Sequence, residues 1–478
     1  MSHTHDDELV EEILPAGQPR LLRVLTAKTG TAVIIGAIIG SGIFMVPSTV
    51  ASQVGSPALS LFVWIIGGVL ALAGALCYAE LGAAIPRSGG TYAFLRRAYN
   101  TDLIAFLFGW AFLFIIITGA MGAVATVFAR YASGLFAIED LWTERYLAVG
   151  CILFLTVVNC LGVKIGGSVQ NVFAFIKVGA VLAVILLGFS MATGTEVAWT
   201  PLVQEKTGTA LLGGLSLAIL GALFAYNGWF FVTFIATEIK DPARSIPRAI
   251  FAALAIVATV YILANVVYLT VLSFEELQAS RRPAADTLQA LVGPSGAMAI
   301  SAAIMLTTFG TVNAQLMVAP RVYHAMANHE IFFRVCQYVH PRFRTPVVSI
   351  VMQGLWASVF ALTGTFVEIV SFAMFYTYVF LTLAVIGLMI LRRKEPDLHR
   401  PYRVWGYPVT PVLFLVIAAG VLANALIGDF TRPLLGLVIL AIGLPFYFYW
   451  KRQQRANPAA GSTADPAAGS TAGSTSKE

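Results

Sequence analysis

The sequence predicts an all-α membrane protein, a bundle of twelve transmembrane helices. Of its 478 residues, 58% are hydrophobic and only 11% are charged, whereas soluble domains are about a quarter charged. The charges are clustered, so that long uncharged runs lie between them, and such runs require a bilayer. This composition excludes a disordered chain, a coiled coil and a nucleic-acid binder with a basic face.

The uncharged runs give the spans in chain order. The first run, between Lys28 and Glu80, has room for two helices, with Pro57 in the turn between them. A membrane helix needs roughly 20 residues. Ten further runs have room for one helix each, at 102–130, 145–164, 177–196, 206–238, 248–275, 286–321, 344–368, 368–392, 403–429 and 432–451. They lack the alternation of barrel strands, and a helix satisfies its own backbone in lipid.

Basic residues predict the orientation. If the N-terminus is inside, 22 of the 30 Lys and Arg residues fall on inner stretches and 6 on outer ones. Cytoplasmic loops are enriched in these residues. We therefore predict a multi-pass protein of the cell (inner or plasma) membrane with both termini cytoplasmic. Residues 1–20 are predicted to form a cytoplasmic tail. Residues 456–478, which contain PAAGST twice, are predicted to be disordered.

Two spans contain residues that interrupt a helix. The first reads TAVIIGAIIGSGIFMVPSTV, with Gly40, Ser41 and Gly42 at its centre. Such a stretch frees backbone groups that lipid cannot satisfy, although small residues also allow close helix contact without a break. The sixth span carries Asn227 and Gly228 at its centre, and Asn-Gly is a turn dipeptide. We predict that both spans are broken.

Interruptions five spans apart are typical of an inverted repeat of five plus five helices. The predicted repeats are residues 21–192 and 208–391, and residues 404–450 add helices 11 and 12. A broken helix exposes N–H groups where one half begins and C=O groups where the other ends. The N–H groups attract a carboxylate and the C=O groups attract an ammonium. The sequence therefore predicts a site for a zwitterion such as an α-amino acid.

Motifs along most of the chain resemble those of one family. In order, they are IIGSGIF at 38–44, YAELGAAIPRSGGTYAFLRRAY at 78–99, VNCLGVKIGGSVQNVFAFIK at 158–177, FAYNGW at 224–229, TEIKDPARSIPRAI at 237–250, FGTVNA at 309–314, HPRFRTPV at 340–347 and PYRVWGYPVTP at 401–411. The chain resembles the amino acid–polyamine–organocation superfamily of permeases, which has the LeuT-type fold. Within it, the sequence is most similar to the L-type amino acid transporter branch, in a prokaryote-type form.

The resemblance implies roles for residues at the first break. In that family the backbone amides at the positions of Ser41 and Gly42 bind the substrate carboxylate, and Gly40 allows close approach. The carbonyl of Ile38 meets the substrate amine. The Ser41 hydroxyl could add a donor, or it could bond back to its own helix.

At the second break, the resemblance implies that Phe224 is an aromatic gate above the substrate. Carbonyls of Phe224 and of the Asn227 position would complete the amine site. Trp229 could close the pocket or simply pack. The family usually has Ala-Tyr-Gly-Gly-Trp here, so Asn227 is a departure. It favours small or polar substrates, unless it only caps the half-helix.

Lys164 is predicted to take the place of a sodium ion. An ionisable residue in a membrane is functional by default, although a lysine near a helix end can also snorkel. The branch carries a lysine on its fifth helix where sodium-coupled relatives bind Na⁺, which implies sodium-independent transport. Proton coupling through Lys164 stays open, because the pKa of a lysine shifts readily on burial.

We therefore expect a secondary transporter that exchanges neutral, small or polar L-amino acids by alternating access. Proton symport and a non-transporting amino acid sensor are the alternatives. No enzyme motif, cofactor, metal site or nucleic-acid partner is predicted. The outer loop at 133–144 lacks the cysteine through which animal members join a glycoprotein subunit, so no covalently linked heavy chain is expected. The sequence predicts no oligomeric state.

Overall fold

The computed structural model describes residues 26–85, 89–137, 140–161, 163–191, 208–231, 233, 239–343, 345–428 and 430–456. Within them, eight helices are long and apolar enough to cross a membrane, and a bent pair of helices brings the number to as many as nine. Three shorter apolar helices, at Phe175–Met191, Ala210–Ala225 and Val347–Thr363, coincide with the remaining predicted spans. The predicted tails lie outside the described residues, apart from Ala456.

Helices account for the regular structure of both halves. The first half consists of α1 (Ala27–Ile38), α2 (Gly42–Val54), α3 (Pro57–Ala84), α4 (Thr91–Tyr99), α5 (Asp102–Ala111), a π-helical turn (Phe112–Ile116), α6 (Ile117–Leu135), α7 (Leu141–Cys160) and α8 (Val163–Met191). The second half consists of α9 (Gly208–Ala225), α10 (Pro242–Val271), α11 (Phe274–Ala279), α12 (Pro283–Val292), α13 (Pro294–Val318), α14 (Pro320–Asn328), a 3-10 turn (Arg334–Gln337), α15 (Val347–Thr363), α16 (Phe366–Lys394), α17 (Val409–Gly428) and α18 (Thr431–Ala456).

The turn predicted at Pro57 is present. Helix α2 ends with Gly55 in the left-handed region, at φ 66°, which glycine adopts without steric cost. Pro57 is the first residue of α3, and the Ser56 side chain caps that helix by accepting a hydrogen bond from the Leu59 amide at 3.5 Å. A proline at the first helical position loses no hydrogen bond, because that amide has no partner within the helix.

The third span contains a local irregularity that its composition does not predict. Five residues, Phe112–Ile116, form a π-helical turn between α5 and α6. The Thr118 hydroxyl donates to the Leu113 carbonyl at 2.7 Å. Because a wider turn disturbs the regular ladder of backbone bonds, this side chain supplies a hydrogen bond at the point of disturbance.

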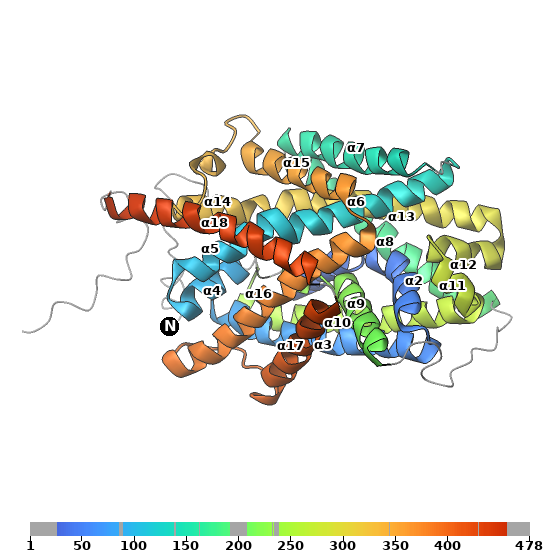
Figure 1. The fold of residues 1–478 in the computed structure, drawn as a ribbon, viewed down its shortest axis with the longest axis horizontal. Helices are drawn as coiled ribbons and strands as arrows, with labels where there is room; N and C mark the ends of the chain where they lie inside the picture. Colours follow the sequence, from blue (N-terminus) through green and yellow to red (C-terminus); the bar gives the residue numbers. More distant parts are fainter. Residues whose placement is uncertain are drawn as a thin grey trace, which may run out of the picture.

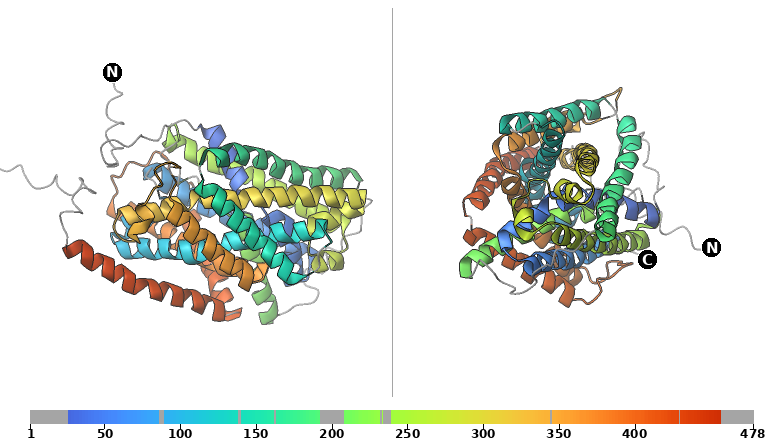
Figure 2. Two further views of the ribbon diagram at one scale, coloured as in Figure 1. Left: turned by 90° about the horizontal axis from the view of Figure 1, so that it is seen from above. Right: turned by 90° about the vertical axis from the view of Figure 1, so that its right-hand side faces the viewer.

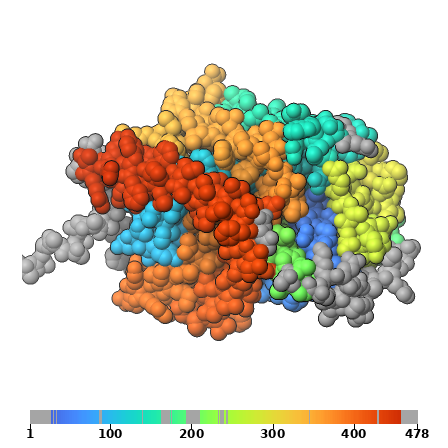
Figure 3. Space-filling view, in the orientation of Figure 1, coloured from blue at the N-terminus to red at the C-terminus, as the bar shows by residue number. Residues whose placement is uncertain are grey.

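The long helices run roughly along one axis of the molecule. Figure 1 shows α4, α5 and α14 at one end of the bundle and α11 and α12 at the other. Seen along that axis in Figure 2, α13 lies inside the bundle, where it contacts α6 and α8. Helix α18 lies on the outside (Figure 3) and exposes apolar side chains such as Leu435 and Val438, as expected of a helix that faces lipid.

Contacts between helices occur in corresponding pairs. Helix α1 packs on α10, and α9 packs on α3. Helix α8 packs on α13, and α16 packs on α6. Helix α6 packs on α15, and α13 packs on α7. In each pair, moving both helices of the first contact by five predicted spans, forward or backward along the chain, gives the helices of the second contact.

Candidate functional site

The first span is broken at the predicted residues. Helix α1 ends at Ile38 and α2 begins at Gly42, with a bend of 44° between them. Ser41 occupies the N-cap position of α2, is 2% exposed and makes no side-chain capping hydrogen bond. The first amides of a helix have no partner within it. The start of α2 therefore offers N–H groups to a ligand inside the protein.

In the sixth span, helix α9 ends at the predicted turn. Helix α9 ends at Ala225, residues 226–228 form a turn, and residues 229–231 form a 3-10 turn. The backbone N–H of Asn227 donates to the backbone carbonyl of Phe224 at 3.1 Å. Gly228 has φ 121°, a conformation that residues with a side chain rarely adopt.

Backbone contacts bring the break in the first span close to the turn that follows α9. A Cβ atom at Gly42 would lie 2.4 Å from the Cα atom of Ala225, and one at Gly228 would lie 3.0 Å from the carbonyl carbon and oxygen of Ala37. Both positions therefore require glycine. At Gly40 the nearest side-chain atom to such a Cβ is Oγ1 of Thr311, at 3.7 Å, so this position has ordinary clearance.

Tyr261 of α10 lies between the C-terminal ends of α1 and α9. Its side chain is fully buried, and its hydroxyl lies 3.0 Å from the Ile38 carbonyl and 3.0 Å from the Ala225 carbonyl. These carbonyls close α1 and α9, and the C-terminal end of a helix carries partial negative charge. One hydroxyl proton is shared between two oxygens, each of which has two lone pairs. The carbonyls can therefore also accept from an ammonium.

Tyr261 is not among the site residues that the sequence predicts. The available signal is a tyrosine within an apolar span, because a buried tyrosine hydroxyl usually needs a hydrogen-bond partner. That signal does not distinguish Tyr261 from Tyr268, which lies two turns later on α10 and is also buried. Among the described residues, the Tyr268 hydroxyl has no hydrogen-bond partner.

A buried lysine contacts the broken first span. Lys177 of α8 is 1% exposed, and its Nζ atom donates to the carbonyl of Gly36 in α1 at 3.1 Å. Lys164 lies in the first turn of α8, but its side chain is outside the part of the chain that the structure describes, so its predicted role stays a prediction. Thirteen residues separate the two lysines, or about 20 Å of helix, so they cannot occupy the same place.

The aromatic residues around the end of α9 are buried and pack on neighbouring helices. Phe224 meets Phe366 of α16 edge to face, with ring centroids 5.8 Å apart. Trp229 meets Tyr78 of α3 in the same way, at 5.2 Å. Asn227 is half-buried. The structure thus places both predicted gating residues beside the break, each against a different helix.

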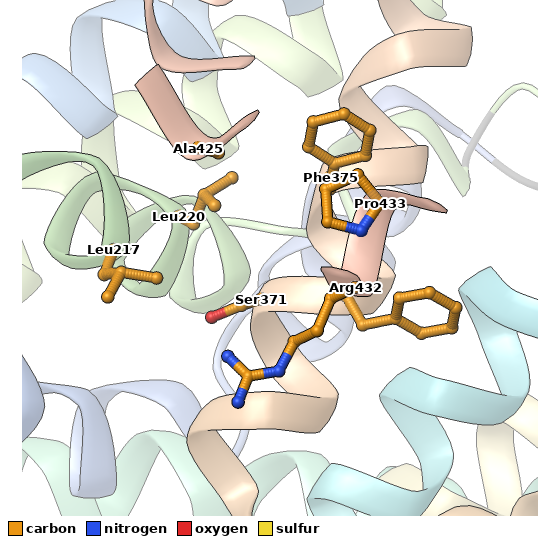
Figure 4. Close-up of a pocket in the computed structure, with 8 residues that line it drawn as sticks. Leu217, Leu220, Ser371, Phe375, Ala425, Arg432 and Pro433 are labelled. Carbon is orange, nitrogen blue, oxygen red and sulfur yellow. The ribbon is translucent and has the colours of Figure 1, made fainter. Parts of the chain in front are cut away.

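A small cavity lies one helical turn from Phe224. Its volume is about 30 Å³, which is enough for water but not for an amino acid. Figure 4 shows the side chains around it, Leu217, Leu220, Ser371, Phe372, Phe375, Ala425, Arg432 and Pro433. Arg432 also pairs with Glu368 at 2.9 Å. This cavity is therefore distinct from the predicted zwitterion site.

Comparison with known proteins decides the family. Residues 25–444 match the amino acid permease family. This chain belongs to that family. The permease is 33% identical over 458 residues to the serine/threonine exchanger SteT of Bacillus subtilis (strain 168), covering 95% of this chain and 99% of the relative. It is 32% identical over 436 residues to the large neutral amino acids transporter small subunit 2 of Homo sapiens, covering 88% and 80%. It is also 32% identical over 451 residues to the human cystine/glutamate transporter, covering 92% and 89%.

Membership of this family confirms the predicted class. The permease is a multi-pass membrane protein that transports amino acids, and it is not an enzyme. The family resemblance drawn from the motifs is confirmed as well. The comparisons do not test the roles of single residues, which stay predictions.

Proposed function

We propose that this permease exchanges small neutral or polar L-amino acids across the cell membrane without sodium. The observation that carries the proposal is the convergence of the Ile38 and Ala225 carbonyls on the Tyr261 hydroxyl, next to the start of α2. The amides of Ser41 and Gly42 bind the substrate carboxylate, and Gly40 leaves room for it. The carbonyls at the ends of α1 and α9 bind the ammonium. Charges are thus met by backbone dipoles rather than by ionised side chains.

The substrate amine reaches three carbonyls in this proposal. The Ile38 and Phe224 carbonyls follow the pattern that the family resemblance implies, and the Ala225 carbonyl is added because it shares the Tyr261 hydroxyl with Ile38. Phe224 and Trp229 gate the site from the two sides of the break. Their contacts with different helices, α16 and α3, support gates that open with separate movements.

The paired helix contacts support twelve spans in a LeuT-type inverted repeat. If spans one and six are equivalent, and likewise two and seven, then the contact of α1 with α10 must correspond to that of α9 with α3. Both contacts are present. The same exchange relates the contacts of α8 with α13 and α16 with α6. Such agreement is expected when two five-helix units repeat with inverted topology.

We propose that Lys177, rather than Lys164, replaces sodium. Its ammonium is buried and donates to the Gly36 carbonyl, close to where α1 ends. A fixed positive charge there supplies what a bound cation would supply in a sodium-coupled carrier. Lys164 lies about 20 Å away along the same helix. Transport without sodium follows from this substitution.

The substrate class rests on Asn227 and on the relatives. A half-buried amide beside the break reduces the volume available to a large apolar side chain and adds a hydrogen-bonding group. The relative named as a serine/threonine exchanger is covered over 99% of its length. We therefore propose serine, alanine and similar amino acids as substrates. Preference for leucine over both alanine and serine would contradict this choice.

The distribution of basic residues supports an orientation with both termini in the cytoplasm. The end of the bundle with α4 and α14 (Figure 1) would then face the cytoplasm, and the end with α11 and α12 would face outward. A covalent heavy-chain partner is not proposed, because the outer loop at 133–144 has no cysteine.

Transport by proteoliposomes tests the proposal. Vesicles loaded with unlabelled L-serine should take up labelled L-serine, whereas empty vesicles should not. Replacing Na⁺ with choline should leave the rate unchanged. Concentrative uptake into empty vesicles driven by a Na⁺ gradient would refute sodium independence, and uptake driven by a pH gradient would favour proton symport. Serine binding without flux under any condition would indicate a sensor.

A further inference from the structure

A larger cavity lies between the C-terminal part of α3 and the first turns of α10. Its volume is about 440 Å³, within the range of ligand-binding pockets. Helix α3, helix α10 and the segment between α16 and α17 form its walls, with the side chains of Leu76, Arg244, Pro247, Arg248, Phe251, Pro401, Tyr402 and Trp405. None of these residues belongs to the site proposed for amino acids.

One face of α10 gives the cavity its charge. Arg244, Pro247, Arg248 and Phe251 follow one another at the spacing that places residues on the same side of a helix. Both arginines are exposed. Neither forms a salt bridge with a carboxylate among the described residues, whereas Arg392 and Arg400 nearby are paired. The cavity therefore presents two guanidinium groups that are available to an anion.

A buried carboxylate holds in place the segment between α16 and α17, which forms another wall of the cavity. Glu80 of α3 is fully buried and accepts a hydrogen bond from the Val404 amide at 2.6 Å. It also pairs with Arg392 at 2.5 Å and with Arg400 at 3.4 Å. Arg400 further donates to the carbonyls of Leu391 and Glu395, at 3.0 and 2.9 Å. The segment that carries Tyr402 and Trp405 is thus tied to α3 and α16, so the cavity is formed in advance of any ligand.

The cavity also has an apolar, outward-facing side. Phe251 is 54% exposed and Trp405 is 80% exposed. Tryptophan at the end of a membrane bundle is typical of the interface between lipid and water. Tyr402 also lines the cavity, and its phenol is protonated at neutral pH, so the hydroxyl can donate to a phosphate. A ligand with an anionic head and an apolar body fits this arrangement.

We propose that this cavity binds one anionic phospholipid of the inner leaflet. Arg244 and Arg248 bind its phosphate group, and Phe251 and Trp405 contact its acyl chains. Basic pockets between helices on the cytoplasmic side of a membrane are suited to such lipids. The assignment to the inner leaflet rests on the proposed orientation, but binding of the lipid does not.

Titration of the full-length permease in nanodiscs of phosphatidylcholine tests this site. Native mass spectrometry would count bound dioleoyl phosphatidylglycerol, and a dansyl-labelled form would report its affinity. We expect one high-affinity phosphatidylglycerol on the wild type. The double variant R244Q/R248Q should bind this lipid at least about tenfold more weakly. Trp405→Ala should lower the affinity by a smaller factor.

The matched control is the double variant R393Q/K394Q, which removes two charges from the same end of the bundle but from outside the cavity. It should bind the lipid like the wild type. Equal loss in both double variants would overturn the proposal, because it would indicate nonspecific attraction. Equal affinity for dioleoyl phosphatidylcholine, or for glycerol phosphate without acyl chains, would overturn it as well.

Thermal unfolding of each variant verifies that the fold is intact, and serine exchange is measured on the same wild-type preparation. Absence of serine exchange by the wild type would contradict the proposed function without affecting the conclusion on lipid binding. Loss of selective lipid binding with normal exchange would contradict only the lipid site.

Discussion

At the residue scale, the proposed amine site depends on the side chain of Tyr261. Its hydroxyl orients the carbonyls that end α1 and α9. Tyr261→Phe removes the hydroxyl and leaves two buried acceptors without that donor, at a cost of about 1–3 kcal/mol. We expect the half-saturation concentration for L-serine to rise about tenfold, as measured by exchange in proteoliposomes.

Tyr268→Phe is the matched control. It removes a buried hydroxyl from the same helix that has no hydrogen-bond partner among the described residues. Exchange by this variant should resemble that of the wild type. An equal loss in the two variants would show that the tyrosine hydroxyls of α10 act on stability rather than on substrate.

Substitution of the two lysines of α8 should have opposite effects on exchange. If Lys177 replaces sodium, Lys177→Gln abolishes most exchange, because a neutral amide leaves the end of α1 without its cation. Lys164→Gln then retains exchange. The measurement is the initial exchange rate, normalised to the amount of monodisperse protein. The reverse outcome would return the role to Lys164.

Residues that shape the backbone could be predicted from the sequence, and residues that act through their surroundings could not. Gly42 and Gly228 are recognisable because each lies in a short helix-breaking sequence, Gly-Ser-Gly and Asn-Gly respectively. Tyr261 and Lys177 gain their roles from carbonyls on α1 and α9 that lie far away in sequence. Which of two lysines or two tyrosines reaches those carbonyls depends on how the helices pack.

At the scale of elements, the contact between α2 and α9 holds the break in the first span against the end of α9. Gly42→Ala places a Cβ atom 2.4 Å from the Cα atom of Ala225, so the helices must separate. Overpacking of this kind costs about 1–3 kcal/mol. We expect Gly42→Ala to lower the unfolding temperature and to remove most exchange.

Gly213→Ala on α9 is the control for that substitution. No atom lies within 4 Å of a Cβ there, and alanine favours a helix over glycine by about 1 kcal/mol. Its unfolding temperature should equal or exceed that of the wild type. If Gly42→Ala behaved likewise in a differential scanning fluorimetry experiment, the close contact would not be needed for the site.

The sequence also predicted which elements begin or end at sharp signals. Pro57 starts α3, and α9 ends just before Asn227 and Gly228. The π-helical turn at Phe112–Ile116 was not predicted, because it lies in a uniformly apolar run. Short helices such as α4 and α14 were also missed, since their charged residues look like loops when only the long uncharged runs are sought.

At the scale of the whole molecule, the scarcity of charged residues accounts for the proposed mode of substrate binding. Few ionised side chains are placed within the spans, and for this reason we propose that backbone groups bind the two charges of the substrate. The broken helices supply such groups at one place, where α1, α2, α9 and α10 meet. In the proposed inverted repeat, the paired helix contacts would let one five-helix unit move against the other around that place.

Counterflow of labelled L-serine in proteoliposomes, with analogues that lack one charge, tests this account most directly. The account predicts that unlabelled L-serine and L-alanine compete for uptake. Ethanolamine, which lacks the carboxylate, and 3-hydroxypropionate, which lacks the amine, should not compete even in large excess. Competition by either analogue as strong as that by L-serine would contradict a site that recognises both charges.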